Sequence, residues 1–146
     1  MEAQTIRGDM IYIMYIRGKM RGLNMLIRIS ESSGKPIYQQ IRDEIVAAIA
    51  AGRLEEGAVL LSARKLGKEL GVNYHTVNNA YNLLSSEGFV VLDSKKRVVV
   101  EPHELVTDEF KQKWRQSETM KIREGLAHGL SKGELKRLFA KFLEEA

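Results

Sequence analysis

A helix-turn-helix pattern between Gly71 and Val90 is the feature that most limits what this chain can fold into. A short helix ends at Gly71, and Asn73 is a favourable N-cap for a second helix, because its side chain can accept from unpaired backbone N–H groups. Apolar residues then recur at helical spacing, namely Val77, Ala80, Tyr81 and Leu84. Two helices joined in this way place the start of the second helix in the major groove of DNA.

Two helices are expected before the turn. The first begins with Pro36 at position N1, where its missing N–H costs nothing, and it ends at Gly52. Its apolar stripe consists of Ile37, Ile41, Ile45, Ala48 and Ile49. Ser62 caps the next helix. In that helix Leu66 and Leu70 are expected to face inward, and the residues expected to face outward are Arg64, Lys65 and Lys68.

A β-hairpin is expected after the helix-turn-helix. Residues 89–92 and 97–100 are rich in β-branched side chains, and residues 93–96 link them. Three basic side chains, Lys95, Lys96 and Arg97, give the hairpin a positively charged tip. Three helices followed by a two-stranded hairpin make a winged helix.

Residues 103–146 are expected to form two helices. Gly129 breaks the helical pattern, and Ser131 with Glu134 forms a capping box that starts the last helix. The two helices carry more apolar surface than they can bury against each other, so a second copy of the chain is the expected partner. The expected dimer interface consists of Phe110, Trp114, Leu135, Leu138, Phe139 and Phe142.

Residues 1–24 are expected to be an N-terminal extension that is dispensable for function. Their apolar run at 10–16 is too short to span a bilayer, and it fits either a strand or an extension without stable structure. The expected domains are therefore the extension 1–24, a winged helix-turn-helix at 25–102 and a helical dimerisation segment at 103–146. The predicted fold is mainly α with a small β-hairpin.

Composition excludes several classes of protein. The chain has 146 residues and no cysteine, which suits a small cytoplasmic protein without disulfides. Its net charge of +4 gives little support to nucleic-acid binding by itself. The three histidines, His75, His103 and His128, lie in separate segments, so no metal site is expected. No phosphate-binding loop or nucleophile elbow supports an enzyme, and no cofactor is expected.

Three motifs carry a family resemblance. Residues 36–41 read P-I-Y-Q-Q-I and residues 57–66 read G-A-V-L-L-S-A-R-K-L. The third motif consists of Val72, Thr76, Val77, Ala80, Tyr81, Leu84, Glu87 and Gly88. In spacing and residue type these motifs resemble the GntR family of transcription regulators. The short tail around residues 129–131 is similar to the dimerisation segment of the family's YtrA-like branch, so the resemblance covers about residues 25–146.

The chain departs from the family pattern at several positions. Leu61 stands where the family usually has Pro, which relaxes the turn before the Ser cap. Asn78 and Asn79 stand where the family often has Arg. Because Arg favours guanine and Asn favours adenine, we expect a shift toward A·T base pairs at those contacts. The hairpin tip lacks the family's usual Gly, and Asp93 there could repel phosphate.

The resemblance implies roles for particular residues. It places Arg64 at the edge of the groove as a base contact; a solvated charge is the alternative. Tyr74 lies at the start of the DNA-reading helix and could instead stack over the capping turn, and Thr76 either binds phosphate or fills the cap position. The basic hairpin tip approaches the minor groove or the backbone, or is an ordinary solvated turn. The expected DNA-binding residues are Ser62, Arg64, Lys65, Asn73, Tyr74, His75, Thr76, Asn78, Asn79, Lys95, Lys96 and Arg97.

The resemblance also implies a function. We expect a cytoplasmic regulator that binds double-stranded DNA in a sequence-specific way, as a homodimer and most simply as a repressor. The operator would be palindromic, with half-sites about one helical turn apart. No enzyme activity and no membrane partner are expected, and the sequence identifies no small-molecule effector. Two rival functions stay open: an architectural protein without sequence preference, and a ligand sensor with a pocket in the helical tail.

Overall fold

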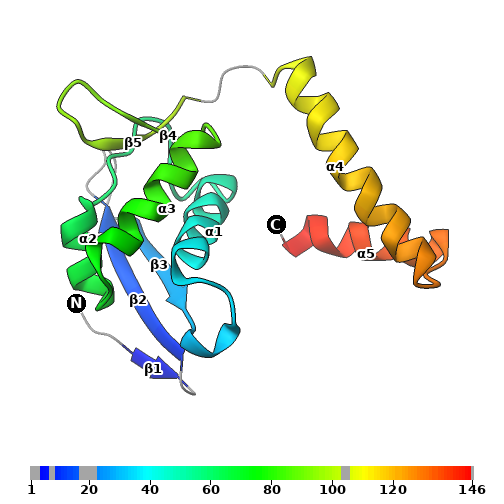
Figure 1. Ribbon diagram of the computed structural model, residues 1–146, viewed down its shortest axis with the longest axis horizontal. Helices are drawn as coiled ribbons and strands as arrows, with labels where there is room; N and C mark the ends of the chain where they lie inside the picture. The colour runs from blue at the N-terminus through cyan, green and yellow to red at the C-terminus, as the bar shows by residue number, and fades with distance from the viewer. Residues whose placement is uncertain (1–3, 7–8, 17–22, 103–105, 146) are drawn as a thin grey trace. The chain divides into compact units, whose positions relative to one another are not determined.

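The chain forms two units, residues Met1–Pro102 and His103–Ala146, in a computed structural model (Figure 1). The structure describes residues 4–6, 9–16, 23–102 and 106–145. The first unit contains β1 (Gln4–Ile6), β2 (Asp9–Ile16), β3 (Leu23–Ile29), a 3-10 turn (Glu31–Ser33), α1 (Ile37–Ala50), α2 (Ala63–Leu70), α3 (Tyr74–Ser86), β4 (Val90–Leu92) and β5 (Val98–Val100). The second unit contains α4 (Asp108–Ala127) and α5 (Lys132–Glu145).

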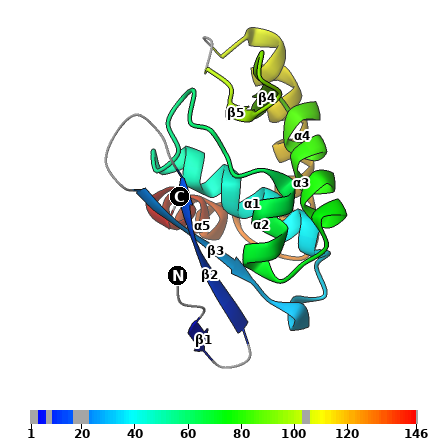
Figure 2. The same cartoon turned by 90° about the vertical axis from the view of Figure 1, so that its left-hand side faces the viewer.

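An antiparallel sheet in the order β1-β2-β3 precedes the helices. β2 pairs with β3 from Met10 opposite Ile29 to Ile16 opposite Leu23. Figure 2 shows β2 and β3 running beside the helices of this unit, with α1 packed on β3. The apolar run at residues 10–16 is therefore a strand, one of the two structures that its sequence allowed. That residues 1–24 are dispensable stays a prediction.

The first helix begins one residue later than its proline predicted. Pro36 is the N-cap of α1 and not its N1 residue, because its ψ of 138° is extended rather than helical. Its carbonyl accepts the N–H groups of Gln39 and Gln40, which starts the helix at Ile37. Gly52 has a φ of +68°, the left-handed conformation expected for a residue that ends a helix.

One apolar cluster holds the first unit together. It joins β3, all three helices and the β4–β5 hairpin, and it includes the predicted stripe of α1 except Ile37, which is half-buried. The buried residues are Ile27, Ile29, Ile41, Ile45, Ala48, Ile49, Leu54, Leu60, Leu66, Leu70, Val77, Ala80, Tyr81, Leu84, Val90 and Val100. None of the buried residues in the part of the chain described is polar or charged. The polar side chains of α2 and α3 are therefore left at the surface.

The second unit is a helical hairpin. Thr107 caps α4 by accepting the N–H of Phe110 at 3.1 Å. The predicted capping box starts α5, since Ser131 Oγ accepts the Glu134 N–H at 3.2 Å and Glu134 Oε2 accepts the Ser131 N–H at 2.8 Å. Gly129 separates the two helices with a φ of +97°. Across the described ranges, no helix is long and apolar enough to cross a membrane.

Candidate nucleic-acid interface

Polar side chains cap the starts of α2 and α3. Ser62 Oγ accepts the N–H of Lys65 at 3.3 Å, and Asn73 Oδ1 accepts the N–H of His75 at 2.9 Å. Both predicted caps are therefore present. Thr76 donates its N–H to the Asn73 carbonyl at 2.9 Å, so the side chain of Asn73 caps His75 and not Thr76.

The turn between α2 and α3 depends on two glycines. Gly71 has a φ of +65°, which ends α2 in the left-handed conformation. Gly67 lies inside α2, where a Cβ atom would lie 2.8 Å from the Val72 carbonyl oxygen and 3.2 Å from the Tyr74 backbone. The backbone of α2 therefore closely approaches the turn and the start of α3, which fixes α2 relative to the start of α3.

Three planar groups lie next to one another at this junction. The guanidinium carbon of Arg64 lies 5.6 Å from the centre of the Tyr74 ring. The His75 ring lies 4.1 Å from the Tyr74 ring, centre to centre, with 32° between their planes. Tyr74 therefore contacts both His75 of α3 and Arg64, the predicted base contact on α2.

The remaining predicted residues of these helices lie at the surface. Lys65, Asn78 and Asn79 are exposed, and Thr76 is half-buried. Asn78 lies one helical turn beyond Tyr74, so the polar face continues along α3. The structure therefore brings the predicted residues of α2 and α3 onto one continuous surface.

The hairpin tip is organised by a carboxylate. Asp93 Oδ1 accepts the N–H groups of Lys95 and Arg97 at 2.9 and 2.8 Å, and Asp93 Oδ2 accepts from Arg97 Nε at 2.7 Å. Lys96 takes the left-handed conformation, with a φ of +56°, in a hairpin tip that contains no Gly. A tight turn followed by a left-handed residue is a common three-residue hairpin connection.

The basic side chains of the tip differ in whether their charge is paired with a carboxylate. Hydrogen bonds from Arg97 hold the pKa of the Asp93 carboxyl below its usual value, and the pair has no net charge. Within the described ranges, Lys95 and Lys96 have no ion pair. Asp93 therefore shapes the turn and neutralises Arg97, whereas the two lysines keep their charge available.

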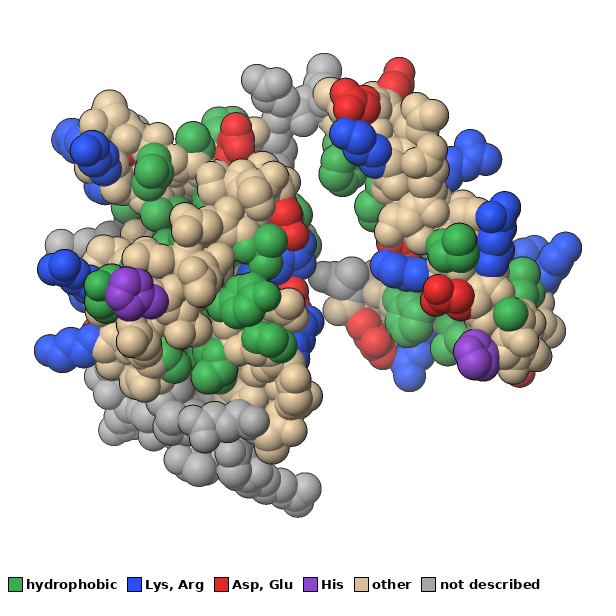
Figure 3. Space-filling view, in the orientation of Figure 1, with side chains coloured by type: hydrophobic (Ala, Val, Ile, Leu, Met, Phe, Trp, Pro, Cys, Tyr) green, Lys and Arg blue, Asp and Glu red, His purple; other side chains and the backbone are tan. Residues whose placement is uncertain are grey.

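The basic side chains share one edge of the first unit. Figure 3 shows Lys and Arg side chains along its left-hand edge, over α2 and the β4–β5 hairpin, with a histidine among them. Phosphate groups are attracted to such an edge even where the total charge of the protein is small.

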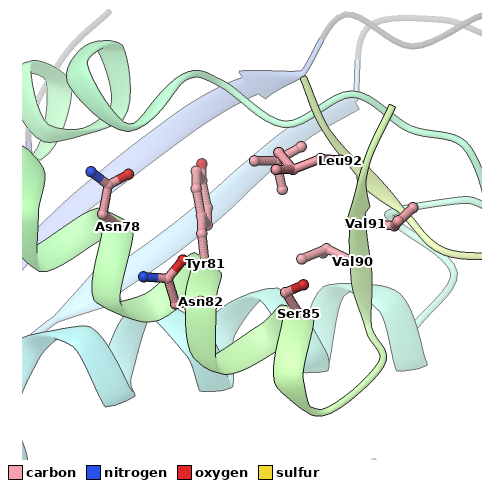
Figure 4. A pocket seen from close by; sticks show the side chains of 8 residues that line it. Asn78, Tyr81, Asn82, Ser85, Val90, Val91 and Leu92 are labelled. Atoms are coloured by element: carbon pink, nitrogen blue, oxygen red, sulfur yellow. The ribbon is translucent and has the colours of Figure 1, made fainter. Parts of the chain in front are cut away.

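A groove separates α3 from the hairpin (Figure 4). Its volume is about 190 Å³, and none of its lining residues is charged. It is lined by Asn78, Tyr81, Asn82, Ser85, Val90, Val91, Leu92 and Val98. Asn82 and Ser85 are not among the residues predicted from sequence, although their spacing of four and seven residues from Asn78 puts all three on one helix face.

Two contacts of α3 and its C-terminal end hold the helices of this surface in place. Tyr81 donates its hydroxyl hydrogen to the Leu61 carbonyl at 2.7 Å, and burial raises the pKa of this tyrosine. The bond fixes the segment before α2 at the position where the family's Pro is missing. Arg42 of α1 donates to Glu87 at 2.7 Å, just beyond α3, and lies over the Phe89 ring.

The predicted dimer residues lie on the second unit, and no residue of its two described helices is buried. Phe110, Trp114 and Phe142 are 57%, 60% and 54% exposed. Leu138 and Phe139 are also exposed, and Leu135 is half-buried against α4. The second unit therefore has an apolar surface that the packing of α4 against α5 does not cover.

Comparison with known proteins identifies the family. Residues 37–100 match the family described as bacterial regulatory proteins, gntR family. The solved structure of YtrA from Sulfolobus acidocaldarius, a GntR-family transcription factor, is 42% identical, with a TM-score of 0.60 over 69% of this chain and 97% of that one. The chain belongs to the GntR family.

Two further proteins are similar to this GntR chain. A transcriptional antiterminator from Listeria monocytogenes is 26% identical, with a TM-score of 0.69 over 78% of this chain and 87% of that one. The HTH-type transcriptional regulator Rv1152 of Mycobacterium tuberculosis is 36% identical over 64 residues. That match covers 44% of this chain and 53% of the relative, so the chain matches about half of that protein.

Membership of the GntR family confirms several expectations. The winged helix-turn-helix contains the segment that matches the family, and the fold with C-terminal helices matches YtrA. The family and the matched relatives are transcription regulators and not enzymes.

Proposed function

We propose that this GntR chain is a sequence-specific DNA-binding transcription regulator that acts in the cytoplasm. The observation that carries the proposal is that Arg64 contacts the start of α3 and that basic side chains of α2 and of the hairpin share one edge of the first unit. Helix starts with exposed amide and guanidinium groups can contact base edges in the major groove. Lys95 and Lys96 would then contact the neighbouring backbone and fix the register of the protein on the duplex.

We propose that Asn78 and Asn79 shift the base preference toward A·T pairs. Both side chains are exposed, and Asn78 lies one helical turn beyond Tyr74 while Asn79 lies one turn beyond His75. An Asn amide can form paired hydrogen bonds with N6 and N7 of adenine. Dense polar side chains on a reading helix favour a sequence-specific regulator over an architectural protein, which would depend on backbone contacts and DNA bending.

We propose that the active form is a homodimer joined through α4 and α5. Full burial of a large apolar side chain contributes about 1.5–3 kcal/mol, and the tail exposes several of them. A second copy offers the same surface through a twofold axis, and the two winged helices would then bind a palindromic operator. Repression would need only that the dimer occupy a promoter and block access of the polymerase.

The dependence of binding on salt tests the hairpin's role in this proposal. Each phosphate neutralised by a protein cation contributes about 0.9 to the slope of log affinity against log salt concentration. We expect Lys95→Ala and Lys96→Ala each to reduce the slope by about 1, because neither lysine forms an ion pair with a described residue. Fluorescence anisotropy with a labelled duplex, from low to high salt, measures the slope.

The Asp93–Arg97 pair provides the matched control. Replacing both residues, as Asp93→Asn with Arg97→Ala, removes a pair without net charge, and Asn keeps an oxygen for the turn. We expect this variant to retain the wild-type slope. A slope that is unchanged in both lysine variants would contradict the placement of the hairpin tip on DNA.

A further inference from the structure

We infer that Tyr74 is a positioning residue that orients Arg64 for base recognition. The inference rests on the proposed DNA-binding function. It starts from the contact in which the Arg64 guanidinium of α2 lies 5.6 Å from the centre of the Tyr74 ring of α3. This distance is within the range of about 6 Å over which a cation is attracted to an aromatic face.

A contact with an aromatic face can hold Arg64 without using its hydrogen-bond donors. A guanidinium group interacts with a ring through its flat face, while its N–H groups point outward in the plane. An ion pair would use those donors, as the contact between Arg97 and Asp93 does in this same protein. Arg64 has no carboxylate partner among the described residues, so its donors are available for the O6 and N7 atoms of guanine.

The Tyr74 ring is itself held in place. Its backbone is fixed by the close approach to Gly67, where a Cβ atom would lie 3.2 Å from the Tyr74 Cα. The His75 ring stacks against it at 4.1 Å, and the N–H of His75 is held by the Asn73 cap. A ring fixed in this way restricts the long Arg64 side chain before DNA binds. Less conformational entropy is then lost when Arg64 contacts DNA.

The test compares three replacements of Tyr74. Tyr74→Phe keeps the ring and removes the hydroxyl, whereas Tyr74→Leu removes the ring and keeps an apolar side chain. Each variant is used in selection of bound duplexes from random DNA, followed by affinity measurements on operators that differ at single base pairs. Tyr74→Ala removes the whole side chain beyond Cβ. Thermal unfolding of this variant shows whether a loss of DNA discrimination is caused by loss of folding.

We expect Tyr74→Phe, which keeps the ring, to retain wild-type discrimination at the base pair that Arg64 contacts. We expect Tyr74→Leu to lose roughly five-fold in discrimination at the base pair that Arg64 contacts, with little change elsewhere. In the background of Arg64→Ala, Tyr74→Leu should have no further effect at that base pair, because the residue it positions is gone.

Other results would overturn the inference. If Tyr74→Phe lost as much discrimination as Tyr74→Leu, the hydroxyl would contact DNA directly and Tyr74 would not act through Arg64. Equal losses at every base pair, or additive effects of Tyr74→Leu and Arg64→Ala, would also contradict it. Failure of the wild type to select any sequence would instead reject the proposed function, so the two failures are distinguishable.

Discussion

Phe139→Asp combined with Phe142→Asp is expected to produce monomers and to weaken operator binding by roughly 100-fold or more. Both rings lie on α5 and contact each other edge to face, with 6.1 Å between the ring centres. Much of their surface is exposed. Carboxylates at the centre of the proposed interface would have to be buried without partners. Linking two DNA-binding units multiplies affinity by about 10²–10⁴, and this gain is lost with the dimer.

The matched control places the same change of charge on the opposite face of α5. Ala140→Asp with Lys141→Ala lowers the charge by two units at exposed positions away from the two rings. Light scattering should give about 16.6 kDa for the phenylalanine variant and about twice that mass for the control and the wild type. A phenylalanine variant that still dimerises would rule out this interface.

Gly67→Ala is expected to destabilise the first unit by about 1–3 kcal/mol, and Gly67→Val by more. The cause is steric, because the added Cβ would lie 2.8 Å from the carbonyl oxygen of Val72, which is backbone and cannot move alone. Any relief separates α2 from α3, so Arg64 and Tyr74 would also lose their mutual position. Denaturant unfolding gives the free energy of unfolding, and anisotropy gives the loss of DNA affinity.

Gly133→Ala is the control for this prediction. Gly133 also lies in a helix, but a Cβ there would meet only side-chain atoms at 3.8 Å or more. Ala favours helix over Gly by up to about 1 kcal/mol, so this variant should be neutral or slightly more stable. If Gly67→Ala behaved in the same way, the close approach of α2 and α3 would not be what fixes the turn.

The features that sequence predicted well are local ones. The caps at Ser62 and Asn73 and the capping box at Ser131 each depend on residues within three positions, so their patterns identify them. The apolar spacing of α3 likewise gave its buried face. The predicted start of α1 was wrong by one residue, because a proline at the N-cap and a proline at N1 look the same in a sequence.

The features that sequence did not predict depend on contacts between distant segments. Pairing of β2 with β3 could not be deduced, since the apolar run at residues 10–16 gives no register by itself. The position of Arg64 over Tyr74 requires two helices to be packed first. The sequence alone predicts that Asp93 could repel phosphate, whereas its ion pair with Arg97 neutralises its charge and its hydrogen bonds shape the turn.

Selection of bound sequences from random double-stranded DNA, using the purified wild-type protein, tests the central claim most directly. We predict enrichment of a palindrome with A·T-leaning positions, whose half-sites lie about one helical turn apart. Specific duplexes should bind roughly 10³-fold or more tightly than random duplexes at the same salt concentration. Salt-sensitive binding without any enriched sequence would contradict the account and favour an architectural DNA-binding protein.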